Sequence, residues 1–167
     1  ASTGLIAWTP SNLNVGDTLI MAVVRDASGA SDTLQWTLTV LNVNDPPVIV
    51  TALTLDSVYE DSSYSRTLLA FDVDKNDAIR WRLRAAPAGM VLDSTTGVLS
   101  WNPSNANVGD TLISVMALDL SGTSDTLTYL LRVVNVNDPP EILNAVVSAT
   151  VYQDSLFRYA LIVTDPD

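Results

Sequence analysis

The sequence of 167 residues predicts an all-β protein built from tandem Greek-key β-sandwich repeats, with about seven strands in each repeat. Residues 3–47 recur as residues 96–140 without a gap, and about 28 of the 45 aligned positions are identical. Within both copies, runs rich in Val, Ile, Leu and Thr show alternating apolar and polar residues, which is typical of half-buried strands. Turn-forming segments such as residues 26–29 and 119–122 separate these runs.

The distance between the two copies sets the repeating unit at 93 residues. A unit of this size can bury one hydrophobic core, so each period is expected to form one small domain. The chain then contains the C-terminal part of a first copy (1–45), a complete copy (46–138) and the N-terminal part of a third copy (139–167). We interpret it as a segment of a longer array. The alternative is that neighbouring molecules complete the two partial copies.

The complete copy carries signals for seven strands and none for a capped helix. The fifth strand is expected to end at Trp101, because Pro103 follows closely and lacks the N–H group that a ladder needs. The last two strands follow turn signals at Gly109 and Gly122. The predicted strands lie near residues 48–58, 64–72, 78–84, 90–93, 97–101, 111–118 and 125–135.

Composition excludes several classes of function. The net charge is −11, with 19 acidic and 8 basic residues, which argues against nucleic acid as a partner. The chain has no cysteine and no histidine, which excludes disulfides, Cys/His zinc sites and histidine general bases. No apolar run approaches the ~18 residues needed to span a bilayer, so no membrane insertion is expected in this segment. We also expect no enzymatic activity, because Asp72 and Asp74 lie on one segment and cannot face each other across a substrate cleft.

The aromatic residues divide into two groups. Trp8 and Trp101 occupy the same position in the two copies, each two residues before a proline, and we interpret them as core tryptophans rather than sugar-stacking ones. Trp81 has no counterpart in the partial copies, and Trp36 is matched by Tyr129. These three residues are the better candidates for an exposed aromatic contact.

Two sequence motifs resemble those of a known family. Asn-Val-Asn-Asp-Pro-Pro ends each copy, at residues 42–47 and 135–140, and is similar to the Asp-x-Asn-Asp-Asn-x-Pro linker of cadherins. Residues 96–138, which contain Trp-x-Pro and Val-Gly-Asp motifs, resemble the dystroglycan-type cadherin-like repeats of large bacterial surface proteins, also described as immunoglobulin-like repeats. The resemblance covers essentially the whole chain and implies a cadherin- or immunoglobulin-like sandwich in each copy.

In cadherins, calcium (Ca2+) binds at the joint between successive domains, and the resemblance implies the same here. Calcium takes six to eight oxygen ligands from carboxylates, carbonyls and water, and gathered carboxylates favour it. Bound calcium would convert a hinge into a stiff joint, and Asn76 or Asp77 is expected to add a backbone carbonyl. The ligands that the resemblance implies are Asn42, Asn44, Asp45, Asp72, Asp74 and Asp119 at the first joint, and Glu60, Asn135, Asn137, Asp138, Asp165 and Asp167 at the second.

The sequence departs from the cadherin pattern at several points. Asn42 and Asn135 replace the first acid of the linker, the later linker Asn is Pro, and no Asp-Arg-Glu motif is present. Glu60 is matched by Gln153 in the third copy. Fewer carboxylates imply weaker binding and fewer ions at each joint. The alternative interpretation is that these acids serve turns and solubility, which are common roles of Asp and Asn in loops.

These observations predict a calcium-stiffened extracellular repeat of a bacterial surface adhesin, stalk or fibre protein, located at the cell surface. The expected partners are adjacent repeats of the same chain, further copies in a fibre, and a cell-surface or polysaccharide ligand. The alternative function is a carbohydrate-binding module of a surface protein that acts on polysaccharides, which needs an exposed row of aromatic rings. Strand exchange between partial copies ranks below a longer array, because the two partial copies lack a counterpart of residues 75–93.

Overall fold

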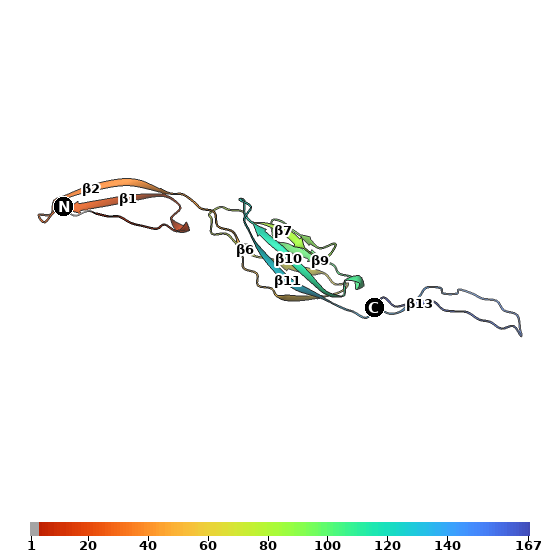
Figure 1. Ribbon diagram of the computed structural model, residues 1–167. Coiled ribbons are helices and arrows are strands. Elements are labelled where there is room, and N and C mark those ends of the chain that lie inside the picture. Colours follow the sequence, from red (N-terminus) through yellow and green to blue (C-terminus); the bar gives the residue numbers. More distant parts are fainter. Residues whose placement is uncertain (1–3) are drawn as a thin grey trace.

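The computed structural model describes residues 4–167 and shows an all-β chain drawn out along one direction (Figure 1). The predicted all-β class is therefore confirmed. Residues 1–3 of the predicted first copy lie outside the described residues. The successive parts are an N-terminal hairpin (4–41), a first linker (42–47), a central sandwich (48–134), a second linker (135–140) and a C-terminal segment (141–167).

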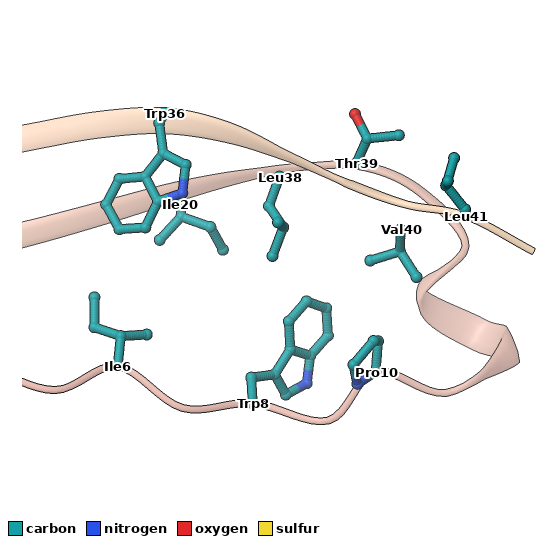
Figure 2. Close-up of a pocket in the computed structure, with 9 residues that line it drawn as sticks. All are labelled: Ile6, Trp8, Pro10, Ile20, Trp36, Leu38, Thr39, Val40 and Leu41. Carbon is teal, nitrogen blue, oxygen red and sulfur yellow. The ribbon is translucent and has the colours of Figure 1, made fainter.

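The N-terminal hairpin pairs two long strands. β1 (Gly16–Arg25) runs antiparallel to β2 (Ser31–Val40), and the short 3-10 helix η1 (Asn12–Asn14) precedes them. The turn between the strands closes because Asp26 Oδ1 accepts two hydrogen bonds of 2.9 Å from backbone N–H groups of the turn. One face of the hairpin is apolar, and the segment that carries Trp8 runs opposite this face (Figure 2).

The central sandwich packs a four-stranded sheet against a three-stranded sheet. Its elements are β3 (Val48–Ile49), β4 (Leu55–Tyr59), β5 (Tyr64–Thr67), β6 (Ala70–Phe71), β7 (Arg80–Ala85), β8 (Val91–Leu92), β9 (Val98–Trp101), η2 (Asn105–Asn107), β10 (Gly109–Leu118) and β11 (Ser124–Val134). The larger sheet has the order β4–β11–β10–β7, with β4 parallel to β11 and the other pairs antiparallel. The smaller sheet has the antiparallel order β5–β9–β8, and a short pair joins β3 to β6.

Two predicted strands are broken in the structure. The expected strand 48–58 is divided into β3 and β4, because the chain leaves its pairing with β6 and joins β11 in the larger sheet. The expected strand 64–72 is divided into β5 and β6 at Leu68, whose N–H donates to the carbonyl of Gly97 at 2.9 Å. Alternation of apolar residues indicates extended backbone but does not indicate the strand with which that backbone pairs.

The core lies between the two sheets of the central sandwich. Trp101 is 5% exposed, as expected for a core tryptophan, and its Nε1 donates to the carbonyl of Ala88 at 3.1 Å. The prediction of an exposed aromatic contact is wrong for Trp81 (7% exposed) and Tyr129 (1% exposed), because both point into the sandwich from alternating strand positions. The buried apolar residues are Tyr64, Leu68, Trp81, Met90, Leu99, Trp101, Ile113, Val115, Ala117, Tyr129, Leu131 and Val133.

Both ends of the chain leave apolar side chains uncovered. In the C-terminal segment, β12 (Glu141–Ile142) and β13 (Val163–Thr164) pair in the register of β3 and β6, displaced by 93 residues. Phe157, between these strands, is 56% exposed. Trp8 is 46% exposed, so the prediction that it lies in a core is wrong for this copy. The reason is that, within residues 4–167, no second sheet covers the apolar face of the hairpin.

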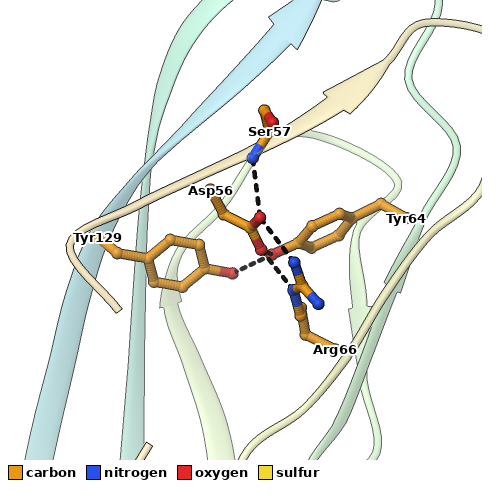
Figure 3. Close-up of polar contacts among 5 residues, drawn as sticks. All are labelled: Asp56, Ser57, Tyr64, Arg66 and Tyr129. Carbon is orange, nitrogen blue, oxygen red and sulfur yellow. Dashed lines mark hydrogen bonds and ion pairs between the residues drawn. The ribbon is translucent and has the colours of Figure 1, made fainter. Parts of the chain in front are cut away.

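A polar cluster ties the two sheets of the central sandwich together (Figure 3). Asp56 of β4 accepts two hydrogen bonds from the guanidinium of Arg66 on β5, and Tyr64 Oη donates to the same carboxylate at 2.9 Å. Tyr64 Oη also lies 2.9 Å from Tyr129 Oη on β11. The hydrogen bonds from Arg66, helped by those from the N–H of Ser57 and from Tyr64, lower the pKa of Asp56 to about 2. Asp56 is therefore an ionised link between the sheets at neutral pH.

The substitution Arg66→Gln is expected to lower the free energy of unfolding of the central sandwich by about 1–2 kcal/mol at pH 7, since Asp56 loses its ion pair while Arg66 is half exposed. The pKa of Asp56 falls from 3.8 to about 2 in the folded chain. The contribution of the pair is therefore complete above about pH 4 and is lost as the pH falls toward 2. Urea unfolding at both ends of this pH range, followed by tryptophan fluorescence, measures the difference.

Arg132→Gln is the matched control for this experiment. Arg132 pairs with Asp110, and the two side chains are 56% and 39% exposed. Because exposed pairs contribute little, this variant is expected to lose much less stability than Arg66→Gln. Equal losses in the two variants, or a loss from Arg66→Gln that persists at low pH, would contradict the role assigned to Asp56.

Gly97 occupies a position that is closed to larger residues. Its φ is +70°, and an added Cβ would lie 2.7 Å from both the carbonyl oxygen of Leu68 and Nε1 of Trp81. Gly97→Ala is therefore expected to destabilise the sandwich by about 2–4 kcal/mol in urea unfolding. Gly122→Ala, with a φ of +86° and no atom within 4 Å of the added Cβ, isolates the backbone effect and should cost about 1 kcal/mol. Similar losses of unfolding free energy in the two variants would show that the close contact at Gly97 contributes nothing to the destabilisation.

Candidate metal centre at the linkers

The two linkers connect the three parts of the chain (Figure 1). Neither contains a helix or a strand, and each ends in two prolines, which have no N–H group to pair with a sheet. Several polar groups of the linkers bond to side chains from the parts on either side. These side chains include many of the acids that the sequence singled out.

Asp45 in the first linker is held from both sides. Its N–H donates to Asp74 Oδ2 in the central sandwich at 2.7 Å, and its own Oδ2 accepts from Asn12 Nδ2 in the hairpin at 2.7 Å. Beside it, Asn44 Nδ2 donates to Asp119 Oδ2 at 2.8 Å. Carboxylates and amides therefore connect the hairpin, the linker and two loops of the sandwich.

Three carboxylates gather beside this linker. Asp72 follows β6, Asp77 precedes β7 and Asp119 follows β10, and one oxygen from each lies within 4.8 Å of the others. The loops are joined because Asp77 Oδ1 accepts from the N–H of Leu120 at 3.0 Å. Only a backbone carbonyl was expected from Asn76 or Asp77, whereas the structure brings the carboxylate of Asp77 into the cluster. A φ of +68° at Asn76 reverses the chain immediately before Asp77, and the sequence alone did not indicate this turn.

Asp72 and Asp74 reach the linker through a turn. The N–H of Asp74 donates to Asp72 Oδ1 at 2.8 Å, which is an Asx-type bond. The segment is therefore not a continuation of the strand β6, in which residues two apart would lie on the same side. The turn still directs both residues to the joint, and Asp74 is buried there.

Three carboxylate oxygens in the described part of the chain are buried without a hydrogen-bond partner. They are Asp72 Oδ2 and Asp74 Oδ1 at the first joint and Glu60 Oε2 near the second, and all three residues belong to the predicted ligand sets. A buried, unpaired, charged oxygen raises the free energy of the folded chain. A bound cation removes this cost, and an all-oxygen donor set suits a hard cation such as calcium. The residues present therefore fit the predicted ion.

The first joint also has room for an ion. A cleft of about 530 Å³ opens beside the linker, with Asn42 and Asn12 among its lining residues. Asp72, Asp74 and Asp77 contribute to the same lining. Lys75 is the single basic residue there, and it is exposed. The excess of negative charge makes the cleft attractive to cations.

Asp119 is buried but remains charged. Burial opposes its ionisation, whereas hydrogen bonds from Asn44 and Thr123 favour it and prevail, so the pKa of Asp119 lies below its ordinary value. The residue therefore presents a carboxylate, which is the form that binds a cation, at neutral pH.

The second joint repeats part of the hydrogen-bond network of the first. Asn105 Nδ2 donates to Asp138 Oδ2 at 2.6 Å, and the N–H of Asp138 donates to Asp167 Oδ2 at 2.9 Å. These bonds correspond to the two that hold Asp45. In addition, buried Glu60, directly after β4, accepts a hydrogen bond of 2.7 Å from the N–H of Val136 in the linker.

Not all predicted ligands come together at the second joint. Asn135 and Asp165 are exposed, and Asn137 Nδ2 donates to the next carbonyl of the linker at 3.1 Å. Among residues 4–167, no group of three acids like the one at the first joint is found here. The physical reason is that the C-terminal segment holds no counterparts of Asp77 and Asp119.

Sequence reasoning missed Asn12 and Asn105. Each belongs to a short 3-10 helix and bonds to a linker aspartate 33 residues further along the chain. Their recurrence in the block Pro-Ser-Asn-x-Asn-Val-Gly-Asp was a usable signal. The contact itself depends on the return of β1–β2 and β10–β11 to the same end of each unit, which local patterns do not show.

Comparison with known families and proteins identifies relatives of this chain. A family model described as "Putative Ig domain" matches residues 46–134. The serine-rich adhesin for platelets of Staphylococcus aureus (strain USA300) is 26% identical over 129 residues, which cover 77% of this chain. The aligned region spans only 5% of the length of that adhesin.

Solved structures of cadherin domains are similar to this chain. Cadherin domains 3–6 of protocadherin gamma B2 have a TM-score of 0.62 at 19% identity, covering 95% of this chain and 46% of that one. Domains 1–4 of protocadherin gamma B7 have a TM-score of 0.59 at 24% identity, covering 90% and 41%. At these identities the likeness concerns the fold, and it confirms the predicted cadherin- or immunoglobulin-like sandwich. Within the described residues, no helix has the length and hydropathy to cross a bilayer.

Proposed function

The chain belongs to the Ig domain family whose model matches residues 46–134, and we propose that it is a calcium-stiffened repeat segment of a bacterial surface adhesin, stalk or fibre protein. Its role is structural and adhesive, and its place is outside the cell, at the cell surface. The relationship to a bacterial adhesin supports this role and this place. In this proposal the chain holds a partial copy (1–45), a complete copy (46–138) and a partial copy (139–167) of one repeat.

The observation that carries the proposal is the carboxylate cluster at the first joint. Asp72, Asp77 and Asp119 converge within 4.8 Å on the boundary between two parts of the chain. One carboxylate oxygen of Asp72 and one of Asp74 at this boundary are buried and have no hydrogen-bond partner. Clustered carboxylates repel one another, so their convergence at a joint favours a bound cation.

The ligand set explains how an ion would stiffen the chain. Asn42 and Asp45 belong to the linker, whereas Asp72, Asp77 and Asp119 belong to loops of the central sandwich. When bound, calcium supplies the positive charge that these oxygens lack. An ion shared by ligands of the linker and of the sandwich would hold them together in addition to the hydrogen bonds. Bending at the joint would then raise the free energy, because it would break contacts with the ion.

The second joint is expected to bind an ion more weakly than the first. It offers Glu60 and Asp138 together with exposed Asp165 and Asp167, but no third loop brings a carboxylate to it. Calcium affinity follows the number and rigidity of the charged ligands. We therefore assign the tighter site to the first joint.

Membership of this family and relationship to an adhesin support a non-enzymatic role. The alternative of a carbohydrate-binding module loses two of its three candidate rings, because Trp81 and Tyr129 are buried. The third, Trp36, lies on the apolar face of the hairpin opposite Trp8 (Figure 2). The three candidate residues therefore do not form the exposed row of rings that a carbohydrate-binding module needs, and the adhesive repeat remains the better proposal.

Calcium is expected to raise the thermal unfolding midpoint by about 5–10 °C relative to EGTA, at a concentration roughly 100-fold above the dissociation constant. The reason is that an ion bound only by the folded chain shifts the equilibrium toward that state. Differential scanning calorimetry in calcium, magnesium and EGTA measures the shift. Equal midpoints in calcium and EGTA would contradict the proposal, and an equal rise in magnesium would contradict its selectivity for calcium.

The variant Asp119→Asn is expected to weaken calcium binding at the first joint by about tenfold or more, because one of the clustered carboxylates is lost. Isothermal titration calorimetry measures the affinity. Asp154→Asn is the control, since Asp154 is exposed, lies outside both linkers and has a φ of +63° that Asn tolerates. An unchanged titration of Asp119→Asn, with a normal unfolding midpoint in EGTA, would remove Asp119 from the site.

A further inference from the structure

Three arginines recur at alternate positions of one strand of the central sandwich. β7 has the sequence Arg-Trp-Arg-Leu-Arg-Ala, in which Arg80, Arg82 and Arg84 are exposed and Trp81 is buried. Because alternate residues of a strand point to the same face, the arginines follow one another at about 7 Å on the outer face of the sheet. Arg84 is exposed at the point where the pairing of β7 with β10 shifts. The three residues are called the basic stripe below.

The basic stripe lies at the margin of the central sandwich. β7 is an edge strand of the four-stranded sheet and pairs with β10 on one side (Figure 1). The residues aligned with Arg80 and Arg82 on β10, and next to these on β11, are all uncharged: Leu118, Met116, Ser124 and Thr126. The stripe is therefore bordered on the same face by apolar and hydroxyl side chains.

The positive charge of the stripe is not neutralised by ion pairs. Among residues 4–167, the two ion pairs belong to other arginines. Arg80 donates to the hydroxyl of Thr95 at 2.8 Å, and this bond brings no negative charge. In the same loop, Asp93 Oδ1 accepts from the N–H of Thr95 at 2.9 Å. Three guanidinium groups therefore face the solvent without a carboxylate partner in the described part of the chain.

Protection of the sheet edge does not explain the stripe. Charged side chains on an edge strand discourage pairing with other chains, and charges of either sign serve this purpose. Acidic residues outnumber basic residues by 19 to 8 in this chain, yet β7 has three arginines and no acid. A local positive field on an acidic protein attracts negatively charged partners. The single sign of the stripe therefore indicates an anionic ligand.

The chemistry and spacing of the stripe restrict the kind of anion. The planar guanidinium fork of arginine matches two oxygens of one sulfate, phosphate or carboxylate group. Duplex DNA carries one charge per ~1.7 Å of its axis, which is much denser than one arginine per ~7 Å. Most of its phosphates would meet the acidic remainder of a chain whose net charge is −11. A polysaccharide that carries sulfate groups on separate sugar rings suits the sparser spacing.

An acidic peptide fits this surface less well than a polysaccharide. A peptide that adds to an edge strand uses the free N–H groups of that edge. The N–H of Trp81 already donates to the carbonyl of Ser94 at 2.9 Å, so part of the edge of β7 is occupied. The outer face beside the arginines is open instead, and its apolar and hydroxyl side chains suit the C–H and O–H groups of sugar rings.

We propose that the basic stripe binds a sulfated polysaccharide. Sulfate groups lie on the guanidinium groups of Arg80, Arg82 and Arg84, and the sugar rings lie over the uncharged residues of β10 and β11. This inference rests on the proposed function for the place of the chain at a cell surface, and it names the ligand of the adhesive repeat. Recognition by charge does not need the exposed row of aromatic rings that a carbohydrate-binding module uses.

Isothermal titration calorimetry of the 167-residue chain with a size-defined heparin oligosaccharide tests the contact, and EGTA in the buffer separates it from calcium binding. The affinity is expected to fall by about 10- to 30-fold between 50 and 200 mM salt, as about three sulfate contacts release their counterions. The double variant Arg82→Gln/Arg84→Gln should lower the affinity by about tenfold or more. Its unfolding midpoint should stay unchanged, because neither arginine forms an ion pair within residues 4–167.

Arg25→Gln/Arg158→Gln is the matched control. It removes the same charge from two exposed arginines outside the central sandwich, so its affinity should stay within about twofold of the wild type. A wild type that does not bind heparin, or equal losses in the two double variants, would overturn the stripe as the site. Equal binding of the desulfated oligosaccharide or of an oligoglutamate peptide would overturn the sulfated polysaccharide as its ligand. None of these outcomes affects the calcium test of the joints, which is measured without polysaccharide.

Discussion

The sheets of the central sandwich and the N-terminal hairpin each carry one apolar face, and the architecture follows from whether that face is covered. In the central sandwich, the two sheets cover each other, and residues such as Leu99, Ile113 and Leu131 are fully buried. The hairpin has the same alternation of residues but no opposite sheet, so its Trp8 and Leu38 stay in contact with water. One sequence pattern thus gives a core in one place and an uncovered groove in another. The difference lies only in which strands are present to oppose it.

The central core is more than apolar packing. Asp56, Arg66, Tyr64 and Tyr129 form a hydrogen-bonded chain from one sheet to the other (Figure 3). An ionised carboxylate in this position favours the one arrangement of β4 and β5 that satisfies it, because a displaced strand would leave a charge unpaired. The partial copies have apolar or uncharged residues at the corresponding positions, so this constraint belongs to the central unit.

The linkers connect the parts of the chain through hydrogen bonds, and the first linker lies beside carboxylates that are not fully hydrogen bonded. Asp45 and Asp138 are held by the same pair of hydrogen bonds at the two joints, which gives the chain a recurring connection between its parts. Near Asp45, the carboxylates of Asp72, Asp77 and Asp119 lie close together. One oxygen of Asp72 and one of Asp74 have no hydrogen-bond partner there. Unpaired carboxylate oxygens are costly, and under the proposed function a bound cation at the joint removes this cost.

The sequence by itself determined the all-β class, the 93-residue period, the core role of Trp101 and the acids that surround the linkers. These features follow from local alternation and exact recurrence, which are visible without a fold. Tertiary structure decided that Trp81 and Tyr129 are buried, that Trp8 is not, and that β3 and β4 pair with different partners. It also brought the Asp77 carboxylate and the Asn12 amide to the first joint. These outcomes depend on which distant segments meet in space, because the environment of a side chain is set by residues far away in sequence as much as by its own neighbours.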